Sequence, residues 1–223
     1  MLQRYARNIP ALSEIECEQL RTKRIAIIGC GGIGGHLIDQ AARIGIGTIR
    51  IVDGDCFNES NLNRQLLCNI ENLGQSKADS AQKHISIINP NCHTEVYRSM
   101  LTIENASKIL TGCDLALDAL DNIESRRILA KTAAKLDIPV VYGAICGWVA
   151  QAAIYLPEEP LMDILYPERA RLTDKSVLSF TPALCASMQM SLAVKCLLKR
   201  PVSSGTVYYV DLLNQEFEKL ELL

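Results

Sequence analysis

A glycine-rich turn near the N-terminus has the spacing of a phosphate-binding loop. In the stretch RIAIIGCGGIGGHLIDQ, an apolar run joins a helical pattern through four glycines of interest, Gly29, Gly31, Gly32 and Gly34. Such a turn can present backbone N–H groups and a helix N-terminus to an anion. Asp53 follows Gly34 by 19 residues, a distance at which an acidic side chain can accept hydrogen bonds from a ribose. The alternative is that the glycines only allow a strand and a helix to pack closely.

Polar and charged side chains follow the later apolar runs as well. They are Asp53, Asp55, Asn61, Arg64 and Gln65 after the second run, Lys77 at the start of the next helical pattern, and Asp121 and Asn122 after a third run. Two cations beside a nucleotide favour a triphosphate with a leaving pyrophosphate over a dinucleotide. Asp121 supplies the hard oxygen ligand that Mg²⁺ prefers.

Each of these residues also has an ordinary structural interpretation. Lys77 suits a solvated first helical turn, and Asp121 suits the N-cap of the following helix. Arg64 suits an ion pair with Glu59 or Glu71. Because the residues recur at successive strand ends, we favour phosphate and metal binding.

The elements that position these residues alternate between strand and helix through the first two thirds of the chain. Strands are predicted over 24–29, 48–53, 93–98, 114–120 and 138–145, and helices over 33–44, 76–88, 102–110 and 125–136. This alternation predicts an α/β fold with a Rossmann-like, doubly wound, mostly parallel sheet. The binding crevice of such a sheet lies at the carboxyl ends of its strands.

The pattern changes after residue 145. Residues 148–156 alternate as an antiparallel strand does, 157–181 are Pro-rich and charged and predict a loop, 182–198 predict an apolar helix, and 205–222 predict a closing hairpin. We expect a single domain over 1–223, with a nucleotide-binding part (1–145) and an antiparallel C-terminal sheet extension that contains the crossover loop (146–223).

Composition excludes several other classes of protein. The formal net charge of −2 gives no strong signal for nucleic-acid binding. The sequence contains no run of 18 apolar residues, so no membrane span is predicted. The N-terminus lacks the pattern of a signal peptide. The nine cysteines include no C-x-x-C pair. We therefore expect a cytoplasmic protein.

Eight short motifs together resemble those of the ThiF/MoeB/HesA family, the prokaryotic relatives of ubiquitin-activating enzymes. They are RYARN (4–8), GCGGIG (29–34), IGTIRIVDGD (46–55), SNLNRQ (60–65), LGQSKAD (73–79), NP (89–90), DALDN (118–122) and SMQMSLAVK (187–195). They occur in family order over nearly the whole chain, and the combination is far more specific than the glycine turn alone.

The resemblance implies an ATP-dependent adenylyltransferase. In that reaction a substrate carboxylate attacks the α-phosphate of Mg-ATP, and an acyl-adenylate and pyrophosphate form. The substrate that the family favours is the C-terminus of a small ubiquitin-like sulfur-carrier protein. The alternative is the same reaction on a small-molecule or RNA-attached carboxylate. A nicotinamide-dependent oxidoreductase and a non-catalytic nucleotide-binding scaffold are the competing classes.

The resemblance also implies a role for individual residues. The glycines flank the nucleotide, Asp53 binds the ribose, and Asp121 holds Mg²⁺. Asn61, Arg64 and Lys77 contact the phosphates, and we expect Asp55, Gln65 and Asn122 beside them. Arg7 matches an arginine that reaches the ATP of the other subunit, which implies a homodimer.

The chain departs from many family members in its cysteines. It lacks the two C-x-x-C pairs that bind structural zinc, so no structural zinc is expected. Residues 157–181 contain no cysteine that could form a thioester with the substrate. We therefore predict that the acyl-adenylate is released or handed over without a covalent bond to the enzyme, and Cys146 is the first alternative.

Overall fold

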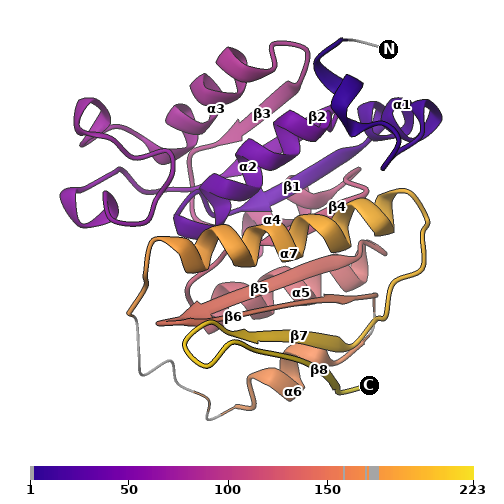
Figure 1. The fold of residues 1–223 in the computed structure, drawn as a ribbon. Helices are drawn as coiled ribbons and strands as arrows, with labels where there is room; N and C mark the ends of the chain where they lie inside the picture. The colour runs from indigo at the N-terminus through magenta and orange to yellow at the C-terminus, as the bar shows by residue number, and fades with distance from the viewer. Residues whose placement is uncertain (1–2, 158, 169, 171–175) are drawn as a thin grey trace.

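The computed structural model describes residues 3–157, 159–168, 170 and 176–223. Within these residues the chain forms an eight-stranded sheet in the order β3-β2-β1-β4-β5-β6-β7-β8, with helices on both faces (Figure 1). The predicted mixed α/β class with a mostly parallel sheet and antiparallel C-terminal strands is confirmed. None of the helices in the described part of the chain is both long enough and apolar enough to cross a bilayer.

The first five strands form the parallel half of the sheet. They are β1 (Arg24–Ile28), β2 (Thr48–Val52), β3 (His93–Tyr97), β4 (Leu115–Asp118) and β5 (Val140–Cys146). The helices that connect them are α2 (Gly32–Ile44), α3 (Lys77–Ile88), α4 (Ile103–Leu110) and α5 (Ile123–Lys135). The last four residues of β1 and all of β4 are buried, because helices cover both faces of this half.

The last three strands form the antiparallel half. They are β6 (Val149–Tyr155), β7 (Thr206–Asp211) and β8 (Glu216–Glu221). Helix α7 (Phe180–Leu197) packs against α2 and against β5 and β6, so it joins the two halves. The predicted loop 157–181 contains a short helix, α6 (Leu161–Leu165), and its prediction as a loop is wrong there because Leu161 and Met162 are buried. Residues 158, 169 and 171–175 of that loop lie outside the described residues.

Short 3₁₀ segments complete the structure. Segments η2 (Glu59–Asn61) and η3 (Ile70–Asn72) lie in the polar stretch between β2 and α3. Before β1 the chain forms η1 (Gln3–Asn8) and α1 (Glu14–Thr22), neither of which we predicted. The capping box between Ser13 and Glu16 begins α1.

The N-terminal segment is anchored to the ends of α2 and α3. Tyr5 is 3 % exposed, and its hydroxyl accepts a hydrogen bond from Asn89 Nδ2 at 2.8 Å. Arg4 donates to Asn89 Oδ1 at 2.8 Å, and Asn8 Nδ2 donates to the Ile44 carbonyl at 3.4 Å. These contacts hold η1 beside the C-terminal end of α2.

Candidate active site

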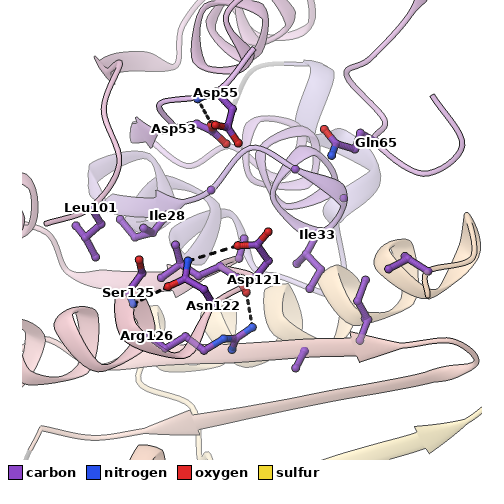
Figure 2. A pocket seen from close by; sticks show the side chains of 18 of the residues that line it. Ile28, Ile33, Asp53, Asp55, Gln65, Leu101, Asp121, Asn122, Ser125 and Arg126 are labelled. Atoms are coloured by element: carbon purple, nitrogen blue, oxygen red, sulfur yellow. Dashed lines mark hydrogen bonds between the residues drawn. The ribbon is translucent and has the colours of Figure 1, made fainter. Parts of the chain in front are cut away.

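A cavity of about 710 Å³ opens where the parallel half meets the antiparallel half (Figure 2). Ten of the thirteen predicted site residues line it: Gly29, Gly31, Gly32, Asp53, Asp55, Arg64, Gln65, Lys77, Asp121 and Asn122. They come from the turns that follow β1, β2 and β4, from the start of α2 and of α3, and from the segment that follows η2. Figure 2 shows Asp53 and Asp55 on one side of the cavity and Asp121 and Asn122 on the other.

The glycine turn serves both packing and ligand access. Gly29 has φ +102°, and a Cβ on Gly34 would lie 1.9 Å from the Gly29 carbonyl oxygen. Gly34 does not line the cavity, so close packing explains it. Gly31 is the N-cap of α2 and offers no side-chain cap, which leaves the first N–H groups of the helix available to an anion.

Asp53 stabilises the glycine turn through hydrogen bonds. Its carboxylate accepts the N–H of Cys30 at 2.7 Å and the N–H of Asp55 at 2.8 Å. Burial raises the pKa of Asp53, and these two hydrogen bonds oppose the rise. A carboxylate has about four acceptor positions, so Asp53 retains capacity for a ligand. Asp55 is more exposed and lies 3.1 Å from Lys77 Nζ.

Lys77 and Arg64 do not have the surroundings that their ordinary structural interpretations require. Lys77 is 7 % exposed, so the solvated-lysine alternative is wrong. Arg64 is half-buried, and its guanidinium donates to the Ser60 carbonyl and to Asn63 Oδ1, each at 2.8 Å. Its acceptors in the described part of the chain are therefore Ser60 and Asn63, and not Glu59 or Glu71. Two cationic groups therefore face the cavity beside the glycine turn.

Asp121 and Asn122 divide the two roles that the sequence left open for Asp121. Asn122 is the N-cap of α5, and its Oδ1 accepts the Ser125 N–H at 2.9 Å. Asp121 is exposed at the cavity, where its carboxylate accepts a long 3.4 Å bond from Asn122 Nδ2. The N-cap alternative for Asp121 is wrong, and its carboxylate stays accessible from the cavity.

A buried ion pair that sequence reasoning missed holds the turn carrying Asp121. Asp118 is fully buried and Arg126 is 3 % exposed, with Arg126 Nη1 3.0 Å from Asp118 Oδ2. Arg126 also donates to the carbonyls of Leu120 and Gly143, and Asp118 accepts the Leu120 N–H at 2.9 Å. Burial raises the pKa of Asp118, and the neighbouring guanidinium opposes the rise. Because Asp118 ends β4 and Arg126 lies in α5, no local pattern in the sequence indicates this pair.

Besides Gly34, two predicted residues, Asn61 and Arg7, do not line the cavity. Asn61 is 5 % exposed, and its Oδ1 caps η2 by accepting the Asn58 N–H at 3.1 Å. Arg7 is exposed in η1, beside the end of α2 opposite to the glycine turn. Because α2 has 13 residues, about 20 Å separates Arg7 from the turn of its own chain.

Sequence reasoning also missed most of the antiparallel wall. The C-terminal end of β5, which pairs antiparallel with β6, forms this wall together with β6, β7 and residues after α6. Its described lining residues are Ala144, Ile145, Cys146, Val149, Gln151, Tyr166, Val177 and Tyr209. Of these, only Cys146 was a candidate beforehand. No pattern in the sequence connects Tyr166 or Tyr209 to the glycine turn, because only the folding of the second half brings them there.

Fold and cavity define a Rossmann-type nucleotide-binding enzyme with its site at the carboxyl ends of parallel strands. The model of the ThiF family matches residues 5–222, and the chain belongs to this family. It is an ATP-dependent adenylyltransferase, as the family and the names of its relatives establish.

Two of the similar proteins align over almost the whole chain. The SAMP-activating enzyme E1 of Haloferax volcanii is 30 % identical over 97 % of this chain and 84 % of its own length. The sulfur carrier protein adenylyltransferase of Thermus thermophilus is 32 % identical over 98 % of this chain and 86 % of its own length.

Solved structures support the fold. A crystal structure of E. coli MccB with MccA-N7isoASN superimposes with a TM-score of 0.87 at 17 % identity, over 99 % of this chain and 71 % of that one. A structure of PaaA superimposes with a TM-score of 0.80 at 22 % identity, over 93 % of this chain and 66 % of that one. The antiparallel C-terminal strands thus belong to an architecture shared with solved enzymes.

Proposed function

We propose that this protein adenylylates the C-terminal carboxylate of a small ubiquitin-like sulfur-carrier protein. One observation carries the proposal: a single cavity joins a charged wall to a mostly uncharged one. Arg64, Lys77 and Asp121 belong to the first, and the strands β6 and β7 contribute to the second. A nucleotide on the charged wall would leave room beside it for a chain terminus. The names of the two relatives favour a carrier protein as substrate.

In this proposal the parallel half binds ATP through the residues that line the cavity. The N-terminus of α2 and the side chains of Arg64 and Lys77 neutralise the phosphates. Asp53 and Asp55 receive the ribose hydroxyls, while Gln65 and Asn122 contact the nucleotide from neighbouring turns. Asn61 supports the phosphate site indirectly, because it holds the segment that carries Arg64.

Asp121 is the proposed ligand of Mg²⁺. Its exposed carboxylate fits a hard divalent cation, although the described residues contain no group of three or more acidic, histidine or cysteine side chains around one point. Mg²⁺ usually keeps several waters and one or two carboxylates together with substrate phosphates, so one aspartate suits it. The ion would neutralise charge on the phosphates.

The reaction needs no nucleophile from the protein. The substrate carboxylate attacks the α-phosphorus of ATP, the bond to the bridging oxygen breaks, and pyrophosphate leaves with the electron pair. The protein positions the two reactants and stabilises the charge that moves to the leaving group.

We further propose that the protein works as a homodimer, with 1–223 acting as one domain in each subunit. Arg7 is too far from the glycine turn of its own chain to contact a nucleotide there, and it is exposed. A second copy could place this arginine on the phosphates, which is the role that its motif implies.

Pyrophosphate exchange tests the proposed substrate. We expect labelled pyrophosphate to enter ATP when the protein is mixed with Mg-ATP and the correct member of a panel of purified ubiquitin-like sulfur carriers. A carrier lacking its last residue is the matched control and should give no exchange. Exchange with small carboxylic acids but with none of the carriers would contradict the carrier assignment and favour the small-molecule alternative.

The proposed reaction ends at the acyl-adenylate. Residues 157–181 contain no cysteine, and Cys185 is fully buried, with a pKa that burial raises to about 12. A reactive cysteine needs an accessible and electropositive setting. Intact-mass spectrometry after turnover without reductant should therefore find unmodified enzyme. A thiol-sensitive adduct of substrate mass would contradict this prediction and point first to Cys146, which lines the cavity.

A further inference from the structure

Tyr166 lines the cavity and takes part in a short hydrogen-bond chain. It follows α6 and is 8 % exposed. Its hydroxyl lies 2.7 Å from the hydroxyl of Tyr142, a fully buried residue of β5. Gln151 of β6, which also lines the cavity, donates from Nε2 to the Tyr142 hydroxyl at 2.7 Å.

The number of available protons determines the direction of donation along these hydrogen bonds. A tyrosine hydroxyl donates one hydrogen bond and can accept two. Tyr142 accepts from Gln151, so its own proton needs an acceptor, and Tyr166 is the acceptor that the described residues provide. A buried donor without a partner is costly, which favours donation from Tyr142 to Tyr166. The proton of Tyr166 then remains for another group, and its hydroxyl makes no second bond with the described residues.

Neighbouring groups hold Tyr166 in place. The guanidinium carbon of Arg126 lies 5.7 Å from the Tyr166 ring centroid and 4.9 Å from that of Tyr142. Arg127 donates to the Tyr166 carbonyl at 2.7 Å. Ring and backbone are therefore both fixed, and the hydroxyl is a preorganised donor.

We propose that Tyr166 uses this proton to donate a hydrogen bond to an oxygen of the acyl substrate, close to the carboxylate that is activated. The inference rests on the proposed function and names a substrate-binding residue within it. The donor belongs to the wall that also includes Gln151, Val149 and Tyr209, none of which carries a charge that would attract phosphate. The groups suited to phosphate, Arg64 and Lys77, come from the parallel half. A carbonyl or carboxylate oxygen thus fits Tyr166 better than a phosphate does.

A pair of variants separates donation to substrate from a structural role. Tyr166→Phe and Tyr142→Phe both break the same Tyr142–Tyr166 hydrogen bond, but only the first removes the donor to the cavity. With the carrier that supports pyrophosphate exchange, Tyr166→Phe should raise KM for the carrier by roughly 10- to 100-fold, as expected for a lost bond to a charged acceptor. KM for ATP should stay within about twofold, and so should both constants of Tyr142→Phe. Thermal unfolding of both variants checks that each is folded.

Three outcomes would overturn the assignment of Tyr166, and a fourth would overturn the proposed function. Equal increases in the carrier KM of both variants would show a structural effect and overturn the assignment of Tyr166. A rise confined to the KM for ATP would assign the proton to the nucleotide and also overturn it. Exchange by the wild-type protein with an unchanged carrier KM in Tyr166→Phe would overturn the Tyr166 assignment alone. If the wild-type protein exchanges with none of the carriers, the proposed function fails, and the inference fails with it.

Discussion

The two walls of the cavity differ in both chemistry and origin. The parallel wall carries Asp53, Asp55 and Asp121 after the ends of strands and Lys77 at the start of α3, whereas the antiparallel wall offers Val149, Gln151 and Tyr209 from the middle or ends of β6 and β7. Parallel strands end together at one edge of a sheet, so each contributes a loop residue there. Antiparallel strands contribute side chains from one face, alternate residues at a time. The charged wall and the mostly uncharged wall thus follow from two kinds of strand pairing, and they are the proposed sites of the nucleotide and of the acyl substrate.

The boundary between the walls depends on the Asp118–Arg126 pair, and its loss should have the largest effect. Arg126→Met leaves the fully buried Asp118 carboxylate without its cation. Breaking a buried pair in this way costs about 3–5 kcal/mol of unfolding free energy, measurable by urea denaturation. Lys131→Met, on an exposed position of the same helix, is the control and should change stability by less than about 0.5 kcal/mol. A decrease of less than about 1 kcal/mol in the unfolding free energy of Arg126→Met would show that this ion pair does not stabilise the boundary between the walls.

On the parallel wall, Asp121→Asn should slow adenylylation without unfolding the protein. If Asp121 holds Mg²⁺, turnover in pyrophosphate exchange should fall by at least roughly 100-fold, as for other lost charge stabilisers. The residue is exposed, so the thermal unfolding midpoint should be unchanged. Asp163→Asn, an exposed acid on α6, is the matched control. Near-normal exchange by folded Asp121→Asn would show that Asp121 is not a ligand of Mg²⁺.

Mixed dimers test whether the parallel wall is complete within one chain. Arg7→Ala and Arg64→Ala subunits should each be inactive, because each change removes a phosphate contact from every site of the pure dimer. Random mixing of the two should restore roughly a quarter of wild-type activity, since half of the dimers then have one intact site in two. Activity no higher than that of either variant alone would mean that Arg7 does not act across subunits.

The smallest effect is expected at Tyr155, in the antiparallel half. This β6 residue is 4 % exposed, and its hydroxyl has no hydrogen-bond partner among the described residues. Tyr155→Phe removes an unsatisfied buried polar group, so stability should stay equal or rise by up to about 1 kcal/mol. Pyrophosphate exchange should be unaffected because Tyr155 does not line the large cavity. Destabilisation by more than about 1 kcal/mol would reveal a bonded hydroxyl.

Local patterns predicted the parallel half well. The helical spacing after Gly32 and the short apolar runs located β1, α2, β2 and the later units within a few residues. The rule that ligands bind at the carboxyl ends of parallel strands predicted where the candidate residues would meet. Ten of the thirteen candidates line one cavity. The N-terminal helix α1 was missed, although the Ser13–Glu16 capping box was a readable signal.

What the sequence by itself determined was the order of elements, the family and the strand-end residues. Periodicity, turns and short motifs are local, and parallel connectivity turns that local information into a site. Only the tertiary structure decided which side chains face one another across the sheet. Gln189 of α7 is fully buried and donates to the carbonyls of Asp118 and Val141, on two different strands. Tyr166 meets Tyr142, Arg126 and the cavity. These contacts join segments far apart in the chain, and their geometry is set by how helices and strands pack, which no local pattern records.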